Sequence, residues 1–414
     1  MRTKSEHSHA NALPSDWITS TVGEEFDIKL GKMLDSQKNV GVAKPYLGNR
    51  AIQWGRIDVD ELPLVPLSQS DLETFRLRQG DLLVCEGGDV GRAAIWTAPI
   101  AECYYQKALH RLRPLKGFNV ELMAAILRHW SEIGLLNNYV TQTSIAHLPR
   151  EKFLQIPLPV PPENEQRAIA KALSDIDALI ATLDRLIAKK RDIKQATMQQ
   201  LLTGKTRLPG FSGKWEAKKL GDVGSTYGGL TGKTKTDFGS GPGLYVTFMN
   251  VMTNVIIDCR TFEKVQVIPE ESQSRVNKGD LLFNGSSETP EEVAMCSYMS
   301  TYIPNLYLNS FCFGFSIRDE QQVDGLFLAY YLRANPGREL MKSLAQGSTR
   351  YNISKTALLD AFIQLPDKTE QIAITGVLSD MDAELSALEA RRDKTRALKQ
   401  GMMQELLTGK TRLI

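Results

Sequence analysis

The chain contains the segment QQLLTGKTRL at residues 199–208 and nearly the same segment, QELLTGKTRL, at residues 404–413. The two copies lie 205 residues apart, and this offset continues toward the N-terminus without a gap. Between 163–208 and 368–413, 24 of 46 aligned residues are identical. Unrelated segments would share only a few residues, so the chain contains an internal duplication.

The duplication extends, more weakly, into the segments that precede these copies. Trp17 with the later Val-Gly-Glu corresponds to Trp215 with Leu-Gly-Asp, and Gly-Asp-Leu-Leu occurs at 80–83 and at 279–282. Two modules that differ in sequence therefore alternate with two segments that are close copies of each other. This layout suggests two variable modules on a constant scaffold. The predicted parts are a flexible N-terminus at 1–11, a first module at 12–160, a first helix at 161–208, a second module at 209–366 and a second helix at 367–414.

Both conserved segments have the apolar spacing of helices that pack at a shallow angle, with steps of three and four residues. The apolar positions are Ile169, Leu173, Ile176, Ile180, Leu183 and Ile187 in the first segment, and Ile374, Leu378, Met381, Leu385 and Leu388 in the second. Because these positions match, we expect the two helices to pack on each other, antiparallel, with one module at each end and a pseudo-twofold axis. The alternative is that each helix packs on its own module.

Polar residues interrupt the apolar pattern at matching places in both helices. They are Lys190, Lys194 and Thr197 in the first, and Arg392, Thr395 and Lys399 in the second. Two interpretations stay open. Either these residues are solvated or fix the register of the helix pair, or another protein docks there.

Each module alternates short strand-like stretches with clusters of Gly, Pro, Asn and Ser, and each also has a helical pattern. Strands are expected at 81–85, 93–97, 154–158, 244–250, 280–284 and 311–317, and helices at about 119–133 and 322–345. The predicted fold class is therefore α+β: two modules of mixed structure joined by two long antiparallel coiled-coil helices.

Three places in the modules concentrate polar, small and basic residues: the turn after each Gly-Asp-Leu-Leu strand, the loop that precedes each conserved segment, and Arg111 with Arg113. Asn and Gln pair with adenine edges, Arg pairs with guanine, and Ser, Thr and Lys hold phosphates. Solvated loops remain the alternative interpretation. The candidate DNA contacts are Arg92, Gln142, Thr143, Ser144, His147, Arg150, Asn284, Ser286, Ser287, Ser348, Thr349, Arg350, Tyr351, Asn352 and Lys355.

Composition and failed motifs exclude several other classes. A net charge of +2 is low for a strongly basic nucleic-acid binder, so any polyanion contact must be local. Thr-Gly-Lys-Thr at 203–206, 231–234 and 408–411 lacks the upstream glycine of a P-loop, and no His pair has metal-ligand spacing. We expect no catalytic site, no cofactor and no metal on this chain. With no secretory signal, no membrane span and five scattered cysteines, we also expect a cytoplasmic protein with buried, reduced thiols.

The ordered set of repeated motifs resembles the specificity subunit of a Type I restriction–modification system over nearly the whole chain. The resemblance is carried by the paired Trp-x4-[Val/Leu]-Gly-[Glu/Asp] starts, the Gly-Asp-Leu-Leu strands, GSTRYNISKTALLDAFIQLP at 347–366 and the duplicated LLTGKTRL ends. The first module departs from it, with QTSIAHLPREKF where the second has STRYNISKTALL.

This resemblance implies a non-catalytic subunit in which each module reads one half of a bipartite double-stranded DNA site. It also implies that the helices set the spacer and dock two modification (methyltransferase) subunits, and that restriction (motor–nuclease) subunits join them. S-adenosylmethionine, Mg and ATP are then expected only on those partners. The alternatives are a subunit of a fused Type II-like restriction–methylation enzyme, a scaffold that binds proteins rather than DNA, and an enzyme with an unrecognised site.

Overall fold

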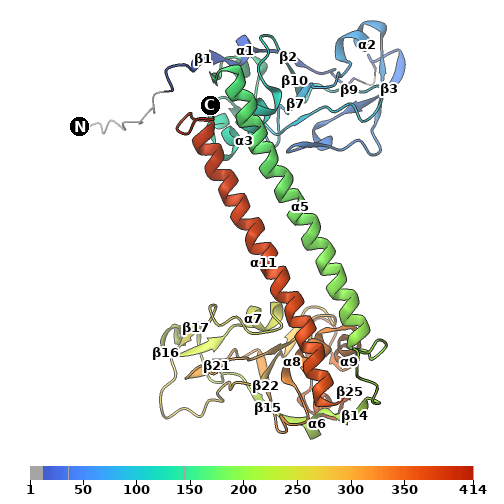
Figure 1. Ribbon diagram of the computed structural model, residues 1–414, viewed down its shortest axis with the longest axis vertical. Coiled ribbons are helices and arrows are strands. Elements are labelled where there is room, and N and C mark those ends of the chain that lie inside the picture. The colour runs from blue at the N-terminus through green and yellow to red at the C-terminus, as the bar shows by residue number, and fades with distance from the viewer. Residues whose placement is uncertain (1–12, 36, 143–145, 414) are drawn as a thin grey trace, which may run out of the picture. The chain divides into compact units, whose positions relative to one another are not determined.

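Two helices of 39 residues, α5 (Glu163–Leu201) and α11 (Lys368–Leu406), link the parts of the computed structural model, which describes residues 13–35, 37–142 and 146–413. The chain divides into unit 1 (Met1–Asp184 with Ala390–Ile414) and unit 2 (Arg185–Glu389), so each unit holds one module and part of both helices (Figure 1).

The two long helices run antiparallel within each unit, as the sequence predicts. In unit 1, Lys399 pairs with Asp177 and Arg396 pairs with Asp184; in unit 2, Lys190 pairs with Glu384. Partner numbers on α11 fall as those on α5 rise, which is the antiparallel order. Both helices are followed by a glycine in the left-handed region, Gly204 (φ +67°) and Gly409 (φ +71°), where a side chain would be strained.

The apolar positions of the two helices are buried or half-buried, but their neighbours differ in part from the prediction. Ile169 and Leu173 pack into the core of the unit 1 module together with Leu406 and Leu407 of the chain's end. In unit 2, Ile374 and Leu378 share a core with Leu201 and Leu202. The first turns of each helix therefore pack on their own module as well as on the other helix. Both packing alternatives are thus correct at the same time.

The module of unit 1 is built on a four-stranded antiparallel sheet in the order β2-β10-β7-β8, against which α3 (Val120–Glu132) packs. Strand β1 (Ile18–Thr21) pairs with β13 (Pro157–Val160) and so joins the start and the end of the module. The other strands are β2 (Phe26–Leu30), β7 (Leu82–Cys85), β8 (Ala93–Ile95) and β10 (Leu109–Pro114), and a second sheet of β6 (Leu64–Leu67), β3 (Val42–Leu47) and β9 (Tyr104–Tyr105).

The module of unit 2 repeats this plan, with the sheet order β15-β22-β18-β20 and with α8 (Gly325–Arg333) in the place of α3. Strand β14 (Glu216–Lys219) pairs with β25 (Phe362–Leu365), as β1 pairs with β13. The other strands are β15 (Gly224–Gly228), β18 (Leu281–Asn284), β20 (Cys296–Tyr298) and β22 (Cys312–Ile317), and a second sheet of β17 (Glu263–Val265), β16 (Phe238–Val246) and β21 (Leu306–Leu308).

The remaining elements are short. In unit 1 they are α1 (Val22–Glu25), α2 (Gln69–Phe75), α4 (Arg150–Leu154), β4 (Ile52–Gln53), β5 (Arg56–Ile57), β11 (Thr141–Gln142) and β12 (Ala146–His147). In unit 2 they are α6 (Leu220–Val223), α7 (Phe248–Thr253), α9 (Asn335–Ser343), α10 (Lys355–Asp360), β19 (Ser286–Ser287), β23 (Ala345–Gln346) and β24 (Tyr351–Ile353). Three single turns of 3₁₀-helix complete the described elements: Asn49–Ala51, Leu135–Asn138 and Lys235–Asp237.

Several expected elements need correction. The strand expected at 154–158 begins only at Pro157, after the short helix α4, and the strand expected at 244–250 gives way to α7 after Val246. The helix expected at 322–345 is two helices, because Ala334 is extended (ψ 168°) just before a new helix that starts with Pro336 in its first turn. All five cysteines are free, as expected, but Cys259 is exposed rather than buried. Throughout the described residues, no helix combines the length and apolar character needed to cross a membrane.

Candidate nucleic-acid interface

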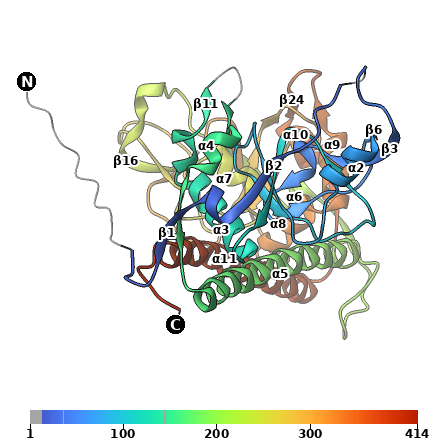
Figure 2. The same cartoon turned by 90° about the horizontal axis from the view of Figure 1, so that it is seen from above.

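In unit 2, two polar stretches that lie far apart in the sequence meet in one small sheet. Strand β19 pairs with β24, and β24 pairs with β23; Ser286 lies opposite Asn352, and Gln346 also lies opposite Asn352. This sheet lies on the side of the unit away from α5 and α11 (Figure 2). The turn after β18 and the loop before α10, both predicted as DNA contacts, therefore form one surface.

The turn between β23 and β24 presents most of the accessible candidates. Gly347 begins this turn with φ +122°, and a Cβ there would lie 2.2 Å from the Arg350 carbonyl oxygen, so only glycine fits. The turn leaves Ser348, Thr349 and Arg350 exposed at its tip, and Asn352 and Lys355 are exposed next to it. Tyr351 is half-buried.

The candidates from the turn after β18 build this sheet rather than face solvent. Asn284 is fully buried: its Nδ2 donates to the carbonyls of Ser286 (3.1 Å) and Glu292 (3.0 Å), and its Oδ1 accepts from the Met295 N–H (2.5 Å). Ser286 and Ser287 are each 7% exposed. A contact to a base or a phosphate needs an accessible group. These three residues are buried, so they support the neighbouring loop and do not themselves face a ligand.

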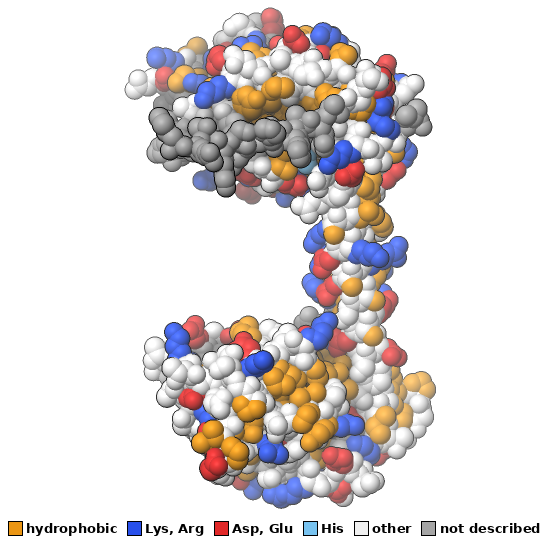
Figure 3. Space-filling model, turned by 90° about the vertical axis from the view of Figure 1, so that its left-hand side faces the viewer, with side chains coloured by type: hydrophobic (Ala, Val, Ile, Leu, Met, Phe, Trp, Pro, Cys, Tyr) orange, Lys and Arg blue, Asp and Glu red, His pale blue; other side chains and the backbone are white. Residues whose placement is uncertain are grey.

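Two cations of this surface lie over aromatic rings. The Arg350 guanidinium lies 5.9 Å from the Phe311 ring centroid, and Lys355 Nζ lies 5.8 Å from that of Phe313. Phe311 is 60% exposed, and the face of unit 2 seen in Figure 3 carries hydrophobic side chains beside Lys and Arg. Phe311 could not be identified from the sequence, because a single aromatic residue at the start of an expected strand has no periodic signal that distinguishes it from a core residue.

Unit 1 has the same backbone arrangement at the corresponding place. Gly87, which follows β7, forms an isolated antiparallel β-bridge with His147. Strand β12 pairs with β11, so that His147 also lies opposite Thr141. His147 is the counterpart of Asn352, 205 residues away. Gln142 lies in β11, whereas Thr143 and Ser144 lie outside the described residues.

The basic candidates of unit 1 are held by backbone carbonyls. Arg92 Nη2 donates to the Asn49 carbonyl at 3.1 Å, and Arg92 also lies 3.5 Å from the Asp89 carboxylate. Arg150 Nε donates to the Ile28 carbonyl at 2.7 Å. Both guanidiniums are partly accessible, so each has a fixed position with donors left for another ligand.

Arg111 and Arg113 do not belong to this surface. Arg111 is 3% exposed and pairs with Asp27 at 2.8 Å, while Arg113 forms two hydrogen bonds to the buried Asp81 carboxylate. The Asp81 hydrogen bonds raise the pKa of Arg113 above its usual value. These arginines, noted in the sequence as a concentration of basic residues, are structural groups of the β10 strand.

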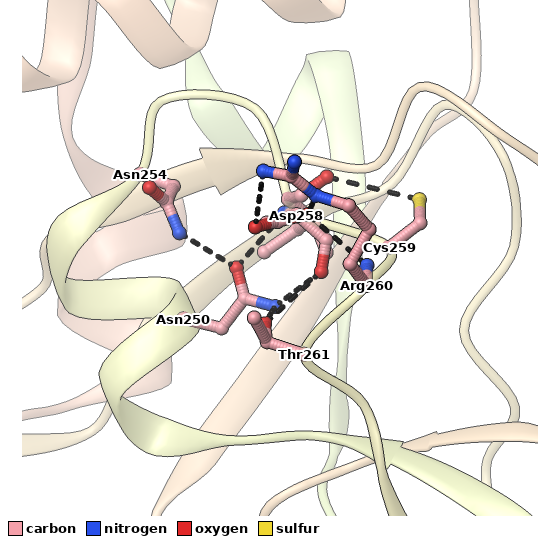
Figure 4. Close-up of polar contacts among 7 residues, drawn as sticks. Asn250, Asn254, Asp258, Cys259, Arg260 and Thr261 are labelled. Carbon is pink, nitrogen blue, oxygen red and sulfur yellow. Dashed lines mark hydrogen bonds and ion pairs between the residues drawn. The ribbon is translucent and has the colours of Figure 1, made fainter. Parts of the chain in front are cut away.

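A further polar cluster in unit 2 supports the loop at 258–261 (Figure 4). Asn250 on α7 donates through Nδ2 to the Asp258 carbonyl and to Thr261 Oγ1, both at 2.9 Å, and its Oδ1 accepts from the Asp258 N–H at 3.0 Å. The loop carries Arg260, whose exposed guanidinium is paired with Asp258. Hydrogen bonds from Arg260 lower the pKa of Asp258. The cluster satisfies its own donors and acceptors, so it is a structural brace.

Both modules are tied to the helix pair by an Arg–Glu ion pair beside a tryptophan ring. Trp17 Nε1 donates to Glu165 Oε2 at 2.8 Å, and Arg412 binds the same carboxylate at 2.7 Å while its guanidinium lies over the Trp17 ring. In unit 2, Arg207 binds Glu370 and lies over the Trp215 ring. The ion pair beside a tryptophan ring is therefore repeated, although of the two tryptophans only Trp17 donates to its glutamate among the described residues.

The fold and this surface define a class of protein: a duplicated binding protein in which two unlike modules present loops of hydrogen-bonding and basic groups on a shared pair of helices. The family model described as "Type I restriction modification DNA specificity domain" matches residues 14–189 and 212–396. The chain belongs to this family. It is a DNA-specificity subunit, and not an enzyme.

Known relatives and solved structures agree with this assignment. The chain is 22% identical to the putative type I restriction enzyme MjaX specificity subunit of Methanocaldococcus jannaschii, over 97% of this chain and 95% of the relative. It is 25% identical to the EcoKI specificity subunit of Escherichia coli over 45% of this chain and 41% of that protein. Its fold is similar to the crystal structure of the type I S subunit from M. genitalium, with a TM-score of 0.58, 16% identity and 96% of each chain covered.

A second solved structure comes from work on the assembly of a complex. It belongs to a study titled as the structural basis of complex assembly and conformational transition of the type I R-M system, and it matches with a TM-score of 0.62 and 18% identity. The match covers 97% of this chain and 100% of that one. This likeness shows that the fold is shared over the full length of both chains.

Proposed function

We propose that each module reads one half of a bipartite double-stranded DNA site. Unit 2 would use the turn between β23 and β24 with Asn352 and Lys355, and unit 1 would use the corresponding surface around β11 and β12. The observation that carries this proposal is that the two surfaces share one backbone plan but not their side chains. His147 stands where unit 2 has Asn352, and Arg150 stands where it has Lys355.

Different side chains on one backbone plan are what two different half-sites require. Asn352 offers an amide that pairs with adenine, and Arg350 offers a fork that pairs with guanine. Lys355 and the hydroxyls of Ser348 and Thr349 suit phosphate oxygens, which fix position without reading sequence. Because all five are exposed, they reach a duplex without any rearrangement of the core.

The helices would set the distance between the half-sites and dock two modification subunits, with restriction subunits joining the complex. A second row of apolar side chains supports this docking. Leu179, Leu186 and Ile193 repeat every seven residues along α5 and are each 37–40% exposed. Such a heptad row on a helix that already has a buried row fits a further helix from a partner. S-adenosylmethionine, Mg and ATP would then be bound by those partners.

The test of modular reading uses the complex assembled with its modification subunits and a randomised DNA library. Replacing residues 209–366 with another second module should change one half-site and leave the other unchanged. A change in both half-sites would overturn the proposal. With a net charge of +2, the lone chain should also bind more weakly, and with a smaller salt dependence, than the assembled complex.

The test of spacing is an insertion of seven residues into α5 and at the matching position of α11. One heptad keeps both apolar rows in phase and lengthens each helix by about 10 Å. The selected sites should keep their half-site sequences and gain about 3 base pairs of spacer, since base pairs rise by about 3.4 Å. An unchanged spacer would show that the helices do not set it.

A further inference from the structure

An exposed aromatic residue in the interface of unit 2 has no counterpart in unit 1. Phe311 N–H donates to Asn309 Oδ1 at 2.9 Å, and its carbonyl accepts from the Gly285 N–H at 2.8 Å. In unit 1 the same backbone contact joins the Glu86 N–H to the carbonyl of Ala108. The backbone is thus conserved between the modules, while the ring is specific to unit 2.

The backbone of Phe311 is held in place by hydrogen bonds, whereas its ring is exposed. Hydrogen bonds hold both backbone polar groups of Phe311, yet its side chain is largely exposed. Burying the ring in a core would stabilise the module, since removal of apolar surface from water is favourable. The exposed ring is therefore accessible to a neighbouring side chain or to a ligand on this surface.

Arg350 is the group that this ring contacts. Its guanidinium lies 5.9 Å from the ring centroid, and within the described part of the chain no carboxylate forms an ion pair with it. A cation–π contact uses none of the guanidinium N–H groups and favours the rotamers that keep the guanidinium over the ring. Arg350 is thus oriented while its donors stay free, whereas Arg92 and Arg150 of unit 1 donate to backbone carbonyls.

We propose that Phe311 and Arg350 act together as a reader of one guanine in the half-site bound by unit 2. The Phe311 ring holds the Arg350 guanidinium in the plane in which it donates two hydrogen bonds to O6 and N7 of guanine. This pairing is the commonest specific contact to a base, and it needs the fork geometry of arginine rather than a positive charge alone. The inference rests on the proposed function, because it names a specificity residue of that same surface.

The experiment compares variants of the assembled complex by selection from a randomised DNA library. Arg350→Lys keeps the charge and loses the fork, so preference for guanine at one position should fall by about 10- to 100-fold. Phe311→Ala leaves Arg350 in place but unsupported, so the same preference should fall by about 2- to 5-fold. The half-site read by unit 1 should stay unchanged in both variants. Phe311→Leu, which keeps an apolar side chain without a π face, should resemble Phe311→Ala.

Matched controls come from the same unit. Phe362→Ala removes a phenylalanine that is 63% exposed on β25, and Arg260→Lys changes an exposed arginine outside the surface. Both should leave base preference unchanged. The inference is overturned if Arg350→Lys leaves base preference intact, if both half-sites change alike, or if affinity falls equally for all sequences, as for a phosphate contact. If replacement of residues 209–366 also leaves both half-sites unchanged, the proposed function fails. If that replacement changes one half-site but the Arg350 and Phe311 variants do not change base preference, the inference alone fails.

Discussion

Lys399 on α11 donates to both carboxylate oxygens of Asp177 on α5, at 2.6 and 2.7 Å, and its side chain is only 9% exposed. The counterparts of both residues, 205 positions away, are Lys194 and Asp382, and they form the same ion pair in unit 2. The lysines that interrupt the apolar rows are therefore cross-helix partners. Of the two interpretations of these interruptions, this contact supports a fixed register.

Removing the lysine should destabilise unit 1. Lys399→Ala leaves Asp177 without its partner, and because that carboxylate is about half exposed we expect a loss of about 1–2 kcal/mol, below the cost for a fully buried pair. Urea unfolding followed by tryptophan fluorescence measures this, since four of the five tryptophans lie in unit 1. Lys394→Ala, an exposed lysine on the same helix, should change little.

An exchange of the two charges separates register from packing. Asp177→Lys combined with Lys399→Asp restores an attractive pair, so it should recover part of the loss, whereas Asp177→Lys alone should be worse than Lys399→Ala. If the exchanged pair is no more stable than the single Asp177→Lys variant, then the contact contributes through packing alone.

The C-terminal residues should detach when Arg412 is removed. Arg412 binds Glu165, which is 4% exposed at its side chain, and also Asp16 at 2.6 Å. Hydrogen bonds from Arg412 lower the pKa of Glu165, so Arg412→Ala leaves this buried carboxylate without a cation at neutral pH, although the Trp17 indole N–H still donates to it. We expect a loss of about 3 kcal/mol in unit 1 and faster hydrogen exchange at residues 407–413. Lys410→Ala is the matched control; equal exchange in both variants would contradict the assignment.

The local parts of this fold could be predicted from the sequence, because their signals are local. The spacing of Ile169 and Leu173 and the repeat of LLTGKTRL predict the helices, and Gly-Asp-Leu-Leu predicts β7 and β18. The break at Ala334 was missed because the apolar pattern continues through it. The contact between Arg412 and Glu165 joins residues 247 positions apart, so no window of sequence contains it.

The sequence could not predict which of the candidate residues are accessible. Residue type alone cannot distinguish the exposed Asn352 from the buried Asn284, since both are asparagines in turn-like polar segments. The distinction arises from the pairing of β19 with β24, which covers one stretch with the other. Phe311 was missed for the opposite reason, because phenylalanine is usually a core residue and only the structure shows its ring exposed.

A thiol-specific reagent should label one cysteine in the native chain. Cys259 is exposed on the loop that Asn250 braces, while Cys85, Cys103, Cys296 and Cys312 are buried. Burial also raises the pKa of Cys103 and of Cys312 to about 12, which suppresses their reactive thiolates. Mass spectrometry should find one label at neutral pH and none in Cys259→Ser. Two or more labels before unfolding would contradict the packing of the buried four.

Acid should destabilise unit 1 through His110. The imidazole is fully buried; its Nε2–H donates to the Leu148 carbonyl at 2.9 Å, and Nδ1 has no partner among the described residues. Burial lowers the pKa of His110 from 6.5 to about 4. Between pH 6.5 and pH 4 the imidazole is therefore protonated in the unfolded chain and neutral in the native chain. The free energy of unfolding consequently falls as the pH falls below 6.5. Between pH 7 and pH 5 the loss should be about 2 kcal/mol.

The counterpart of His110 in unit 2 is Phe313, which supplies the variant that removes this dependence. His110→Phe keeps a ring against Phe153, whose centroid lies 5.3 Å from the imidazole, but carries no titrating group. It loses the bond to the Leu148 carbonyl, so its stability at pH 7 should be lower, while its loss between pH 7 and pH 5 should be smaller by about 2 kcal/mol. His147→Gln, on the surface of the same unit, should keep the full dependence. An identical fall in the denaturant midpoint for wild type and His110→Phe would show that another group is responsible.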